Sequence, residues 1–228
     1  MGKSLFITGT DTDIGKTYVT GLIVKKLRTS GYNAGYYKAA LSGAELSESG
    51  EISSWRCVFV HAMAKIPIAA KESVSYIYRE AVSPHLAAKI NNQPIEMEKI
   101  IKDYTAAKEK YDYLTMEGSG GIICPLRWDD NEKLILDEMV NILGLSVLIV
   151  ASAGLGTINS TVLTVEHLHA KNIPIKGLIF NNYHRGNIME EDNLYMVEKM
   201  TGIKVITAIP SGTTELDINI NDLIALYQ

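Results

Sequence analysis

Short apolar runs alternate along the chain with longer stretches in which apolar residues recur at helical spacing. The expected strands are 5–7, 34–38, 74–78, 113–116, 146–151, 175–180 and 205–209. The expected helices are 18–28, 55–64, 84–90, 95–110, 133–143, 159–171, 190–200 and a short one near 220–227. This alternation predicts a mostly parallel central sheet flanked by helices on both faces, with ligands at the carboxyl ends of the strands. We therefore expect an α/β fold in one domain, residues 1–228.

The loop after the first expected strand has the residues of a phosphate-binding loop. Residues 9–17 read Gly-Thr-Asp-Thr-Asp-Ile-Gly-Lys-Thr and lead into an expected helix. Backbone N–H groups and the positive end of the helix would surround the phosphates, while Lys16 places an ammonium on their oxygens and Thr17 offers a hydroxyl to Mg²⁺. Five residues separate Gly9 from Gly15, one more than in the common P-loop. This loop predicts a P-loop NTPase-like domain that uses a nucleoside triphosphate and Mg²⁺.

Composition narrows the class of partner. A net charge of −4 and a pI near 5.8 argue against a nucleic-acid partner, because phosphate-backbone binding relies on clustered Lys and Arg. Cys57 and Cys124 lie far apart and outside any CxxC spacing, so neither a disulfide framework nor a zinc site is expected. No apolar run approaches about 18 residues, which argues against a membrane span or a signal peptide. We expect a cytoplasmic protein.

Polar residues also follow other expected strands. Glu117 opens the sequence Glu-Gly-Ser-Gly-Gly directly after strand 113–116, where its carboxylate would face the Mg²⁺ of the P-loop. Lys38 ends the second strand and Ser42 follows four residues later, which would put an ammonium and a hydroxyl beside the phosphates. Residues 154–159 start a helix with a glycine-rich segment, whose backbone N–H groups would form an anion site without a basic side chain.

Taken together, these segments resemble the dethiobiotin synthetase family over almost the whole chain. The matching segments are residues 9–17, Tyr37-Lys38 with Ser42-Gly43, Ser83-Pro84-His85, 117–121 with Pro125-Leu126, 154–159, Asn181-Asn182 and Ile209-Pro210. A P-loop alone is common to many ATPases, whereas the order and spacing of all these segments together is specific to a much smaller group of proteins. His85 fits the family pattern, and it is equally compatible with a structural role.

The resemblance implies an ATP-dependent ligase of biotin biosynthesis. In the family, one amine of 7,8-diaminononanoate captures CO₂ as a carbamate, and the carbamate takes the γ-phosphoryl group of ATP. The second amine then attacks the mixed anhydride, which closes a cyclic urea and leaves ADP and phosphate. By position, Lys16 and Lys38 would stabilise charge on the transferring phosphoryl group and the carbamate. Thr17 and Glu117 would bind Mg²⁺.

The resemblance also implies the remaining roles. The catalytic residues would be Lys16, Lys38, Thr12 and Ser42. The nucleotide would contact Asp13, Ile14, Gly15, Lys16, Thr17, Tyr18, Glu117, Gly118, Ser119, Gly120, Asn181, Asn182, Ile209, Pro210 and Ser211. The diamine would contact Thr12, Lys38, Ser42, Gly156, Thr157, Ile158 and Asn159. In the family the segment at 156–159 receives the substrate carboxylate from the neighbouring subunit, which implies a homodimer with active sites at the interface.

The chain departs from the family pattern at two positions. The family usually carries an aspartate for Mg²⁺ and nucleotide at the start of the helix after Ser42-Gly43, where an ungapped alignment puts Trp55. Loss of one anionic ligand should weaken Mg²⁺ binding. Ala39 stands where a proline commonly follows the strand lysine. Two alternatives therefore stay open: an ATP-binding homologue with weak or no turnover that acts as a regulatory or binding module, and a small-molecule kinase of the same class.

Overall fold

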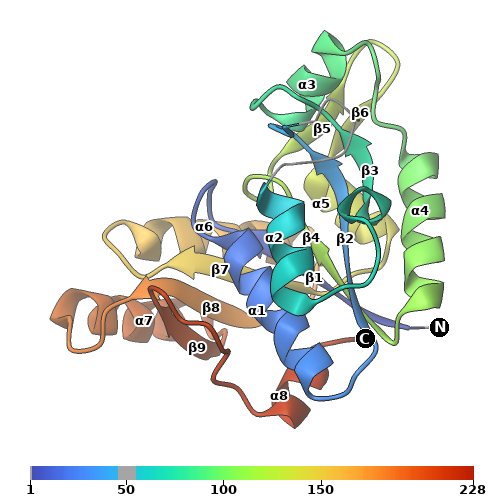
Figure 1. The fold of residues 1–228 in the computed structure, drawn as a ribbon. Coiled ribbons are helices and arrows are strands. Elements are labelled where there is room, and N and C mark those ends of the chain that lie inside the picture. The colour runs from blue at the N-terminus through green and yellow to red at the C-terminus, as the bar shows by residue number, and fades with distance from the viewer. Residues whose placement is uncertain (1, 46–54) are drawn as a thin grey trace.

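Seven parallel strands form the centre of the structure (Figure 1). The computed structural model describes residues 2–45 and 55–228. The strand order is β3-β2-β4-β1-β7-β8-β9. Their bounds are β1 (Lys3–Gly9), β2 (Ala34–Leu41), β3 (Val74–Ile77), β4 (Tyr113–Glu117), β7 (Val147–Ser152), β8 (Ile175–Tyr183) and β9 (Val205–Pro210). The chain first builds the sheet on one side of β1 and then on the other, so the loop after β1 lies at the switch point where such sheets bind ligands.

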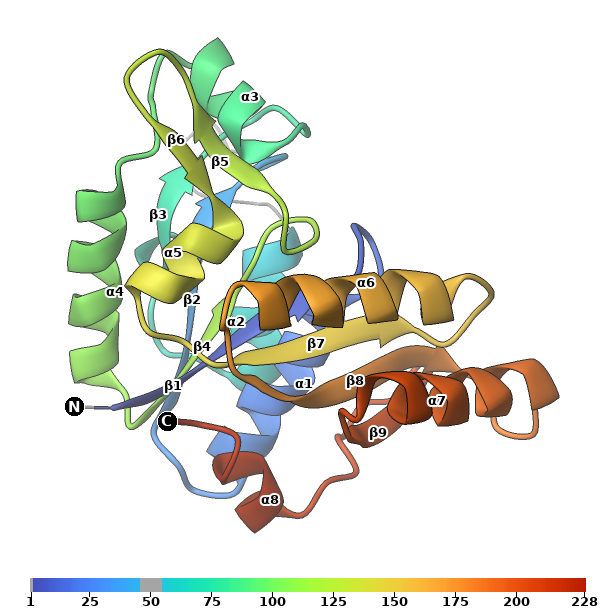
Figure 2. The same ribbon diagram turned by 180° about the vertical axis from the view of Figure 1, so that it is seen from behind.

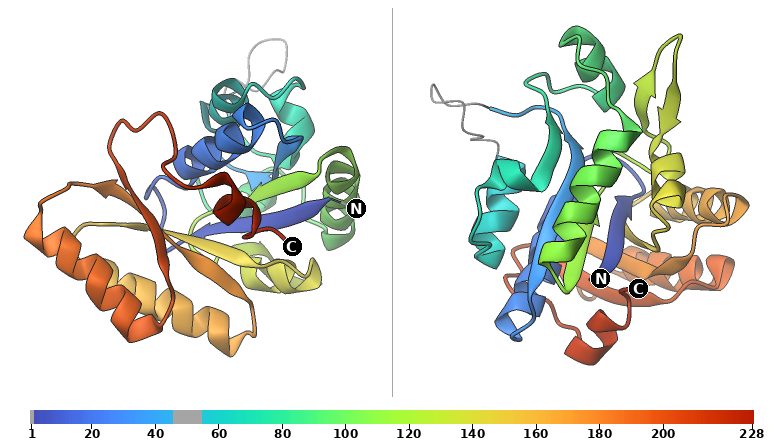
Figure 3. Two further views of the ribbon diagram at one scale, coloured as in Figure 1. Left: turned by 90° about the horizontal axis from the view of Figure 1, so that it is seen from below. Right: turned by 90° about the vertical axis from the view of Figure 1, so that its right-hand side faces the viewer.

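Helices cover both faces of the sheet (Figures 2 and 3). One face is covered by α1 (Lys16–Thr29), α2 (Trp55–Ala64) and α8 (Ile220–Ile224). The other is covered by α4 (Met97–Lys110), α5 (Leu136–Ile142), α6 (Thr157–Ala170) and α7 (Ile188–Thr201). Leu5 and Ile7 of β1 belong to the first core, whereas Phe6 belongs to the second. Burial on both faces explains why this strand is a continuous apolar run in the sequence.

A two-stranded hairpin stands beside the main sheet. It pairs β5 (Pro125–Trp128) with β6 (Lys133–Ile135) in antiparallel orientation, and α3 (Pro84–Ile90) packs against it. The side chain of Asp129 accepts hydrogen bonds from the N–H groups of Asn131 and Glu132, which closes the turn between the two strands. A short 3₁₀ helix, η1 (Ala70–Ser73), leads into β3.

The predicted α/β fold with a parallel sheet covered on both faces is confirmed. The helix expected over 133–143 is wrong at its start, because residues 133–135 form β6 and α5 begins only at Leu136. Backbone pairing with β5, which the sequence pattern did not indicate, overrides the helical spacing there. The tail helix also ends earlier than expected, at Ile224. In the part of the chain that the structure describes, no helix combines the length and apolar character needed to cross a membrane.

Candidate active site

The loop between β1 and α1 folds closely on its own backbone. Gly15 caps the N-terminus of α1 with φ 93°, and Asp13 shares this left-handed region with φ 56°. A Cβ atom at Gly9 would lie 2.5 Å from Ile14 Cδ1 and 2.9 Å from Lys16 Cδ, so a side chain there would displace both of these side chains. The Nζ atom of Lys16 donates to the carbonyl oxygen of Asp11 at 2.6 Å, across the loop. With the first-turn N–H groups of α1, which have no intrahelical acceptors, Lys16 forms a cradle suited to phosphate.

A side chain from β8 braces this loop. The Nδ2 atom of Asn181 donates to the carbonyl oxygen of Ile14 at 3.0 Å. A Cβ atom at Gly15 would lie 2.0 Å from the same nitrogen, so both the positive φ and the contact from Asn181 require glycine there. Asn181, expected on the adenine side, therefore lies against the P-loop itself.

Four buried side chains meet where β4 ends, and we call them the Glu117 cluster: Thr17, Tyr36, Lys38 and Glu117. Lys38 of β2 lies opposite Glu117 of β4 in the sheet register. Its Nζ atom is 2.7 Å from Glu117 Oε1 and donates to the Gly118 carbonyl at 3.0 Å. The Thr17 hydroxyl donates to Oε1 at 2.8 Å, and the Tyr36 hydroxyl donates to Oε2 at 3.0 Å. The cluster joins the start of α1 to the end of β4 and the middle of β2.

The neighbours of Glu117 keep it ionised. Burial raises the pKa of the Glu117 carboxyl, but the charge of Lys38 and the hydrogen bonds from Lys38, Thr17 and Tyr36 outweigh burial and hold the pKa below its usual range. Burial also raises the pKa of Tyr36 well above its usual value, and the neighbouring Cys57 and Glu117 raise it further. The Tyr36 hydroxyl therefore stays protonated and donates to the carboxylate.

Thr17 and Glu117 fit the chemistry of Mg²⁺. Their oxygens lie 2.8 Å apart at the base of the P-loop, and both are oxygen ligands of the kind this ion prefers. Residues 2–45 and 55–228 contain no group of three or more His, Cys, Asp or Glu arranged to hold a metal. Mg²⁺ commonly keeps several waters and binds phosphate oxygens of a nucleotide alongside one or two protein ligands. The side chain of Trp55 and the loop acids Glu48 and Glu51 lie outside the described part of the chain.

The P-loop contacts the glycine-rich loop after β4. A Cβ atom at Gly120 would lie 3.8 Å from the Thr12 hydroxyl oxygen and 3.5 Å from Cys124 Sγ. The Ser119 hydroxyl donates to the Ala40 carbonyl at 2.9 Å, which ties this loop to the end of β2. Just beyond β2, the Ser42 hydroxyl oxygen is buried and finds no hydrogen-bond partner among the described residues. A buried hydroxyl without a partner suits contact with a ligand.

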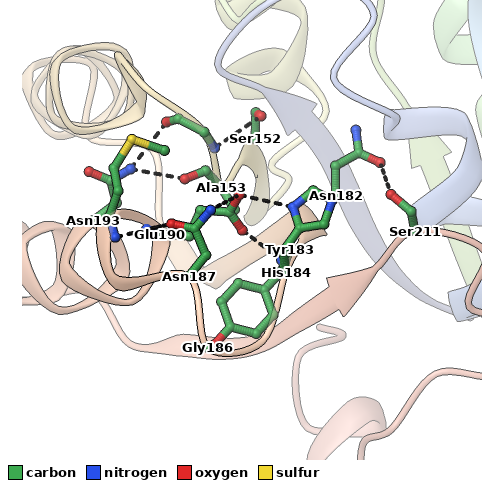
Figure 4. Close-up of polar contacts among 12 residues, drawn as sticks. Ser152, Ala153, Asn182, Tyr183, His184, Gly186, Asn187, Glu190, Asn193 and Ser211 are labelled. Atoms are coloured by element: carbon green, nitrogen blue, oxygen red, sulfur yellow. Dashed lines mark hydrogen bonds and ion pairs between the residues drawn. The ribbon is translucent and has the colours of Figure 1, made fainter.

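The residues expected around the adenine gather at the ends of β8 and β9. The Ser211 hydroxyl donates to Asn182 Oδ1 at 3.3 Å (Figure 4), and Asn182 has φ 56°. Ile209, opposite Asn181 in the sheet register, is buried, whereas Pro210 is exposed. The Tyr18 hydroxyl donates to the carbonyl oxygen of Thr213, which connects the first turn of α1 to this region.

The segment expected to bind the carboxylate lies elsewhere. Gly156 caps α6 with φ 89°, and residues 156–159 run into its first turn. An open groove of about 460 Å³ is lined here by Leu155, Gly156, Ile158, Asn159, Val162, Leu163, Asn193 and Met200. None of these residues belongs to the P-loop or to the Glu117 cluster. Within one chain, the expected carboxylate site therefore lies among the apolar side chains of this groove, and no residue of the phosphate site lines the groove.

Comparison with known proteins identifies the family. Residues 3–214 match a family model described as an AAA domain. The ATP-dependent dethiobiotin synthetase BioD of Clostridium botulinum (strain Loch Maree / Type A3) is 48% identical over 228 residues, which cover 100% of this chain and 99% of the relative. The protein of the same name from Brachyspira hyodysenteriae (strain ATCC 49526 / WA1) is 46% identical over 218 residues, 95% of this chain and 96% of the relative. The chain belongs to the dethiobiotin synthetase family.

Solved structures of other proteins confirm the P-loop NTPase-like fold for this dethiobiotin synthetase family member. A ParA family ATPase from Chlorobium tepidum TLS superposes with a TM-score of 0.56 at 16% identity, covering 92% of this chain and 84% of that one. The septum site-determining protein MinD from Pyrococcus horikoshii OT3, complexed with Mg-ADP, gives a TM-score of 0.56 at 17% identity, covering 92% and 82%.

Two polar residues of this dethiobiotin synthetase family member were missed by the sequence reasoning. Tyr36 lies two residues before Lys38 on the same strand, so alternation along β2 could have placed both side chains on one face. Asn193 lies in the middle of α7 and is buried, although its neighbours in the sequence are largely exposed. No local motif marks Asn193, and its contacts depend on the packing of α7 against the loop after β7.

Proposed function

We propose that the protein is an ATP- and Mg²⁺-dependent dethiobiotin synthetase that acts on 7,8-diaminononanoate and CO₂. One amine attacks CO₂, forms a C–N bond and releases a proton, which gives a carbamate. A carbamate oxygen attacks the γ-phosphorus of ATP and displaces ADP. The second amine then attacks the carbamoyl carbon, expels phosphate and closes the cyclic urea. The observation that carries this function is the Glu117 cluster, which joins Lys38 to the base of the P-loop in a chain of this family.

Each step of this reaction moves negative charge, and the two lysines provide the opposite charge. Lys16 lies within the P-loop cradle and would bind the phosphate oxygens. Lys38 would stabilise the carbamate and the transferring phosphoryl group from the neighbouring strand. The Thr12 and Ser42 hydroxyls would hold the carbamate and the amines, and the unpartnered position of the Ser42 hydroxyl supports this role.

Thr17 and Glu117 would hold the Mg²⁺ ion. When bound, Mg²⁺ neutralises charge on the phosphate oxygens and so assists phosphoryl transfer. The hydrogen bond from Tyr36 orients the carboxylate from the opposite side, at Oε2. The proposed nucleotide contacts remain those given by the sequence: Asp13, Ile14, Gly15, Lys16, Thr17, Tyr18, Glu117, Gly118, Ser119, Gly120, Asn181, Asn182, Ile209, Pro210 and Ser211.

We also propose that two chains form a homodimer through the groove beside α6. Leu155 is 90% exposed, and Leu163 and Met200 of the same groove are 57% and 56% exposed. A second copy would cover this apolar surface and would bring residues 156–159 of one chain to the substrate bound by the other. This arrangement is supported by the absence of every Glu117-cluster residue from the groove that residues 156, 158 and 159 line.

The dimer is tested by light scattering on purified variants. Leu163→Glu should produce monomers, because a charge replaces an apolar side chain in the proposed interface. Ile142→Glu is the matched control, since Ile142 is 56% exposed but lies on α5 outside the groove. A Leu163→Glu variant that stays dimeric would contradict the proposed interface.

The reaction is tested by incubating the protein with Mg-ATP and bicarbonate, with and without the diamine. ADP release that depends on the diamine, together with formation of the cyclic urea, is the expected result. ATP hydrolysis at the same rate with and without the diamine would overturn the proposal. Trp55→Asp should raise turnover or tighten Mg-ATP binding, because it restores the carboxylate usual in the family.

A further inference from the structure

The buried side of α7 carries polar residues where apolar ones would be expected. Glu190, Asn193 and Val197 are 4%, 6% and 0% exposed, and they recur at helical spacing along one face. The two polar residues bind different loops (Figure 4). Glu190 accepts hydrogen bonds from the backbone N–H of His184 at 2.6 Å, and its other oxygen lies 2.9 Å from His184 Nδ1. Asn193 contacts the loop between β7 and α6.

Both amide protons of Asn193 are used by that loop. Its Nδ2 atom donates to the Ala153 carbonyl at 2.9 Å and to the Gly154 carbonyl at 3.2 Å. The Gly154 carbonyl also accepts from the N–H of Thr157 at 3.3 Å, in the first turn of α6. A single buried side chain therefore holds two consecutive peptide groups directly before the helix start, close to Gly156, whose φ is in the left-handed region.

The same loop is tied to the nucleotide side of the protein. The N–H of Ala153 donates to the Asn181 carbonyl at 3.1 Å, while the Ala153 carbonyl accepts from Asn193. Asn181 in turn braces the P-loop through the Ile14 carbonyl. A continuous chain of hydrogen bonds thus runs from the P-loop through Asn181 and Ala153 to Asn193.

We propose that Asn193 is a positioning residue for substrate selection: it fixes the backbone N–H groups at the start of α6 so that they donate hydrogen bonds to the diamine carboxylate. This inference rests on the proposed function, in which that carboxylate comes from the substrate bound by the other subunit. Asn193 does not touch the substrate in this proposal. It acts through the Ala153 and Gly154 peptide groups, whose orientation sets that of the N–H groups that follow.

The experiment compares two vicinal diamines in the wild-type protein and its variants. The first is 7,8-diaminononanoate, and the second is 2,3-diaminononane, in which a methyl group replaces the carboxylate. The measured quantity is kcat/KM for 7,8-diaminononanoate divided by kcat/KM for 2,3-diaminononane. In Asn193→Asp the shape is kept, but an ionised carboxylate would face two carbonyl oxygens; Asn193→Ala removes the donors without adding charge. Glu190→Gln is the control, because it changes an equally buried polar residue of α7 that binds the other loop.

The ratio should fall about tenfold or more in both Asn193 variants, the effect expected when an interaction with a charged group is lost. Most of the fall should come from a higher KM for the carboxylate substrate, while KM for ATP stays close to the wild-type value. Glu190→Gln should keep the wild-type ratio. A purely structural role for Asn193 would lower kcat/KM equally for both diamines and leave the ratio unchanged, which overturns the inference. A wild-type protein that forms no cyclic urea would instead overturn the proposed function, and this inference with it.

Discussion

The Nζ atom of Lys38 lies 2.7 Å from Oε1 of Glu117, and both side chains are at most 5% exposed. The pair comes from adjacent strands in register, so the sheet itself fixes the separation. Taking two charges out of water is costly, and such a pair is retained when its geometry and remaining hydrogen bonds are satisfied, as they are here through Thr17, Tyr36 and the Gly118 carbonyl. The pair therefore ties stability to the chemistry of the site.

Lys38→Met should cost both stability and turnover. Removing the ammonium leaves the Glu117 carboxylate buried with two neutral donors, for which we expect a loss of about 3–5 kcal/mol in the free energy of unfolding. Turnover should fall by about 10²–10³, the range for removal of one charge-stabilising group. Urea unfolding and a coupled ADP assay measure the two effects.

The double variant Lys38→Met/Glu117→Gln separates these effects. With no charge left in the cluster, its stability should exceed that of Lys38→Met alone, while its activity should stay low. A double variant that is no more stable than Lys38→Met would contradict the explanation that Lys38→Met loses stability because it leaves the Glu117 charge uncompensated.

Stability should also depend on pH through Glu117. Its pKa is lower in the folded protein than in the unfolded chain, so on acidification the unfolded chain takes up the proton first. The contribution of Glu117 is fully present above its usual pKa of 4.5 and is lost as the pH falls through the lower folded value. Urea midpoints measured from neutral pH down to about pH 3 should therefore decline less in the double variant than in the wild type, and the difference should develop below the usual pKa of 4.5. Equal declines would show that Glu117 does not contribute.

Tyr36→Phe should weaken the metal site. It removes the donor to Glu117 Oε2. The free energy of unfolding should fall by about 1.5–3 kcal/mol, the range for a hydrogen bond to a charged group. The Mg²⁺ concentration needed for half-maximal activity should rise. Tyr37→Phe is the matched control, because Tyr37 lies on the other face of β2 from Tyr36 and its hydroxyl forms a hydrogen bond with Ser75 of β3. A Mg²⁺ requirement that rises equally in both variants would argue against a role for Tyr36 at Glu117.

Gly15→Ala should weaken nucleotide binding. Gly31→Ala provides the comparison: both glycines have positive φ, 93° and 87°, but a Cβ at Gly31 meets nothing within 4 Å. Gly31→Ala should show only the backbone strain of about 1–2 kcal/mol. Gly15→Ala should add displacement of Asn181 and lower Mg-ATP affinity more than about tenfold, measured by calorimetry. Similar Mg-ATP affinities in the two variants would rule out the contact from Asn181 as the reason for this glycine.

Local motifs correctly placed the P-loop between a strand and a helix and Glu117 at the end of a strand, because each is a short segment of consecutive residues. The parallel sheet followed from the alternation of strands and helices. Lys38 was expected to end its strand, but β2 continues to Leu41, and the pairing of Lys38 with Glu117 comes from a strand order that the alternation did not specify. The hairpin of β5 and β6 was missed because both strands are short and β5 begins with a proline.

Contacts between distant segments could not be predicted in the same way. The role of Asn181 beside the adenine stays a prediction, whereas its hydrogen bond to the P-loop, 167 residues away in sequence, was not predicted. Asn193 is buried only because α7 packs over the loop after β7. Such contacts follow from how the elements pack together, which one sequence without relatives does not specify.

The brace between Asn181 and Ile14 also bears on protein engineering. A designer who wished to change which nucleoside triphosphate the protein accepts would naturally begin with residues at the end of β8. Replacing Asn181 would also remove its hydrogen bond to the P-loop. A single mutation would then change both the base preference and the affinity for the triphosphate. Asn182, whose side chain reaches Ser211, offers a starting point that leaves this brace untouched.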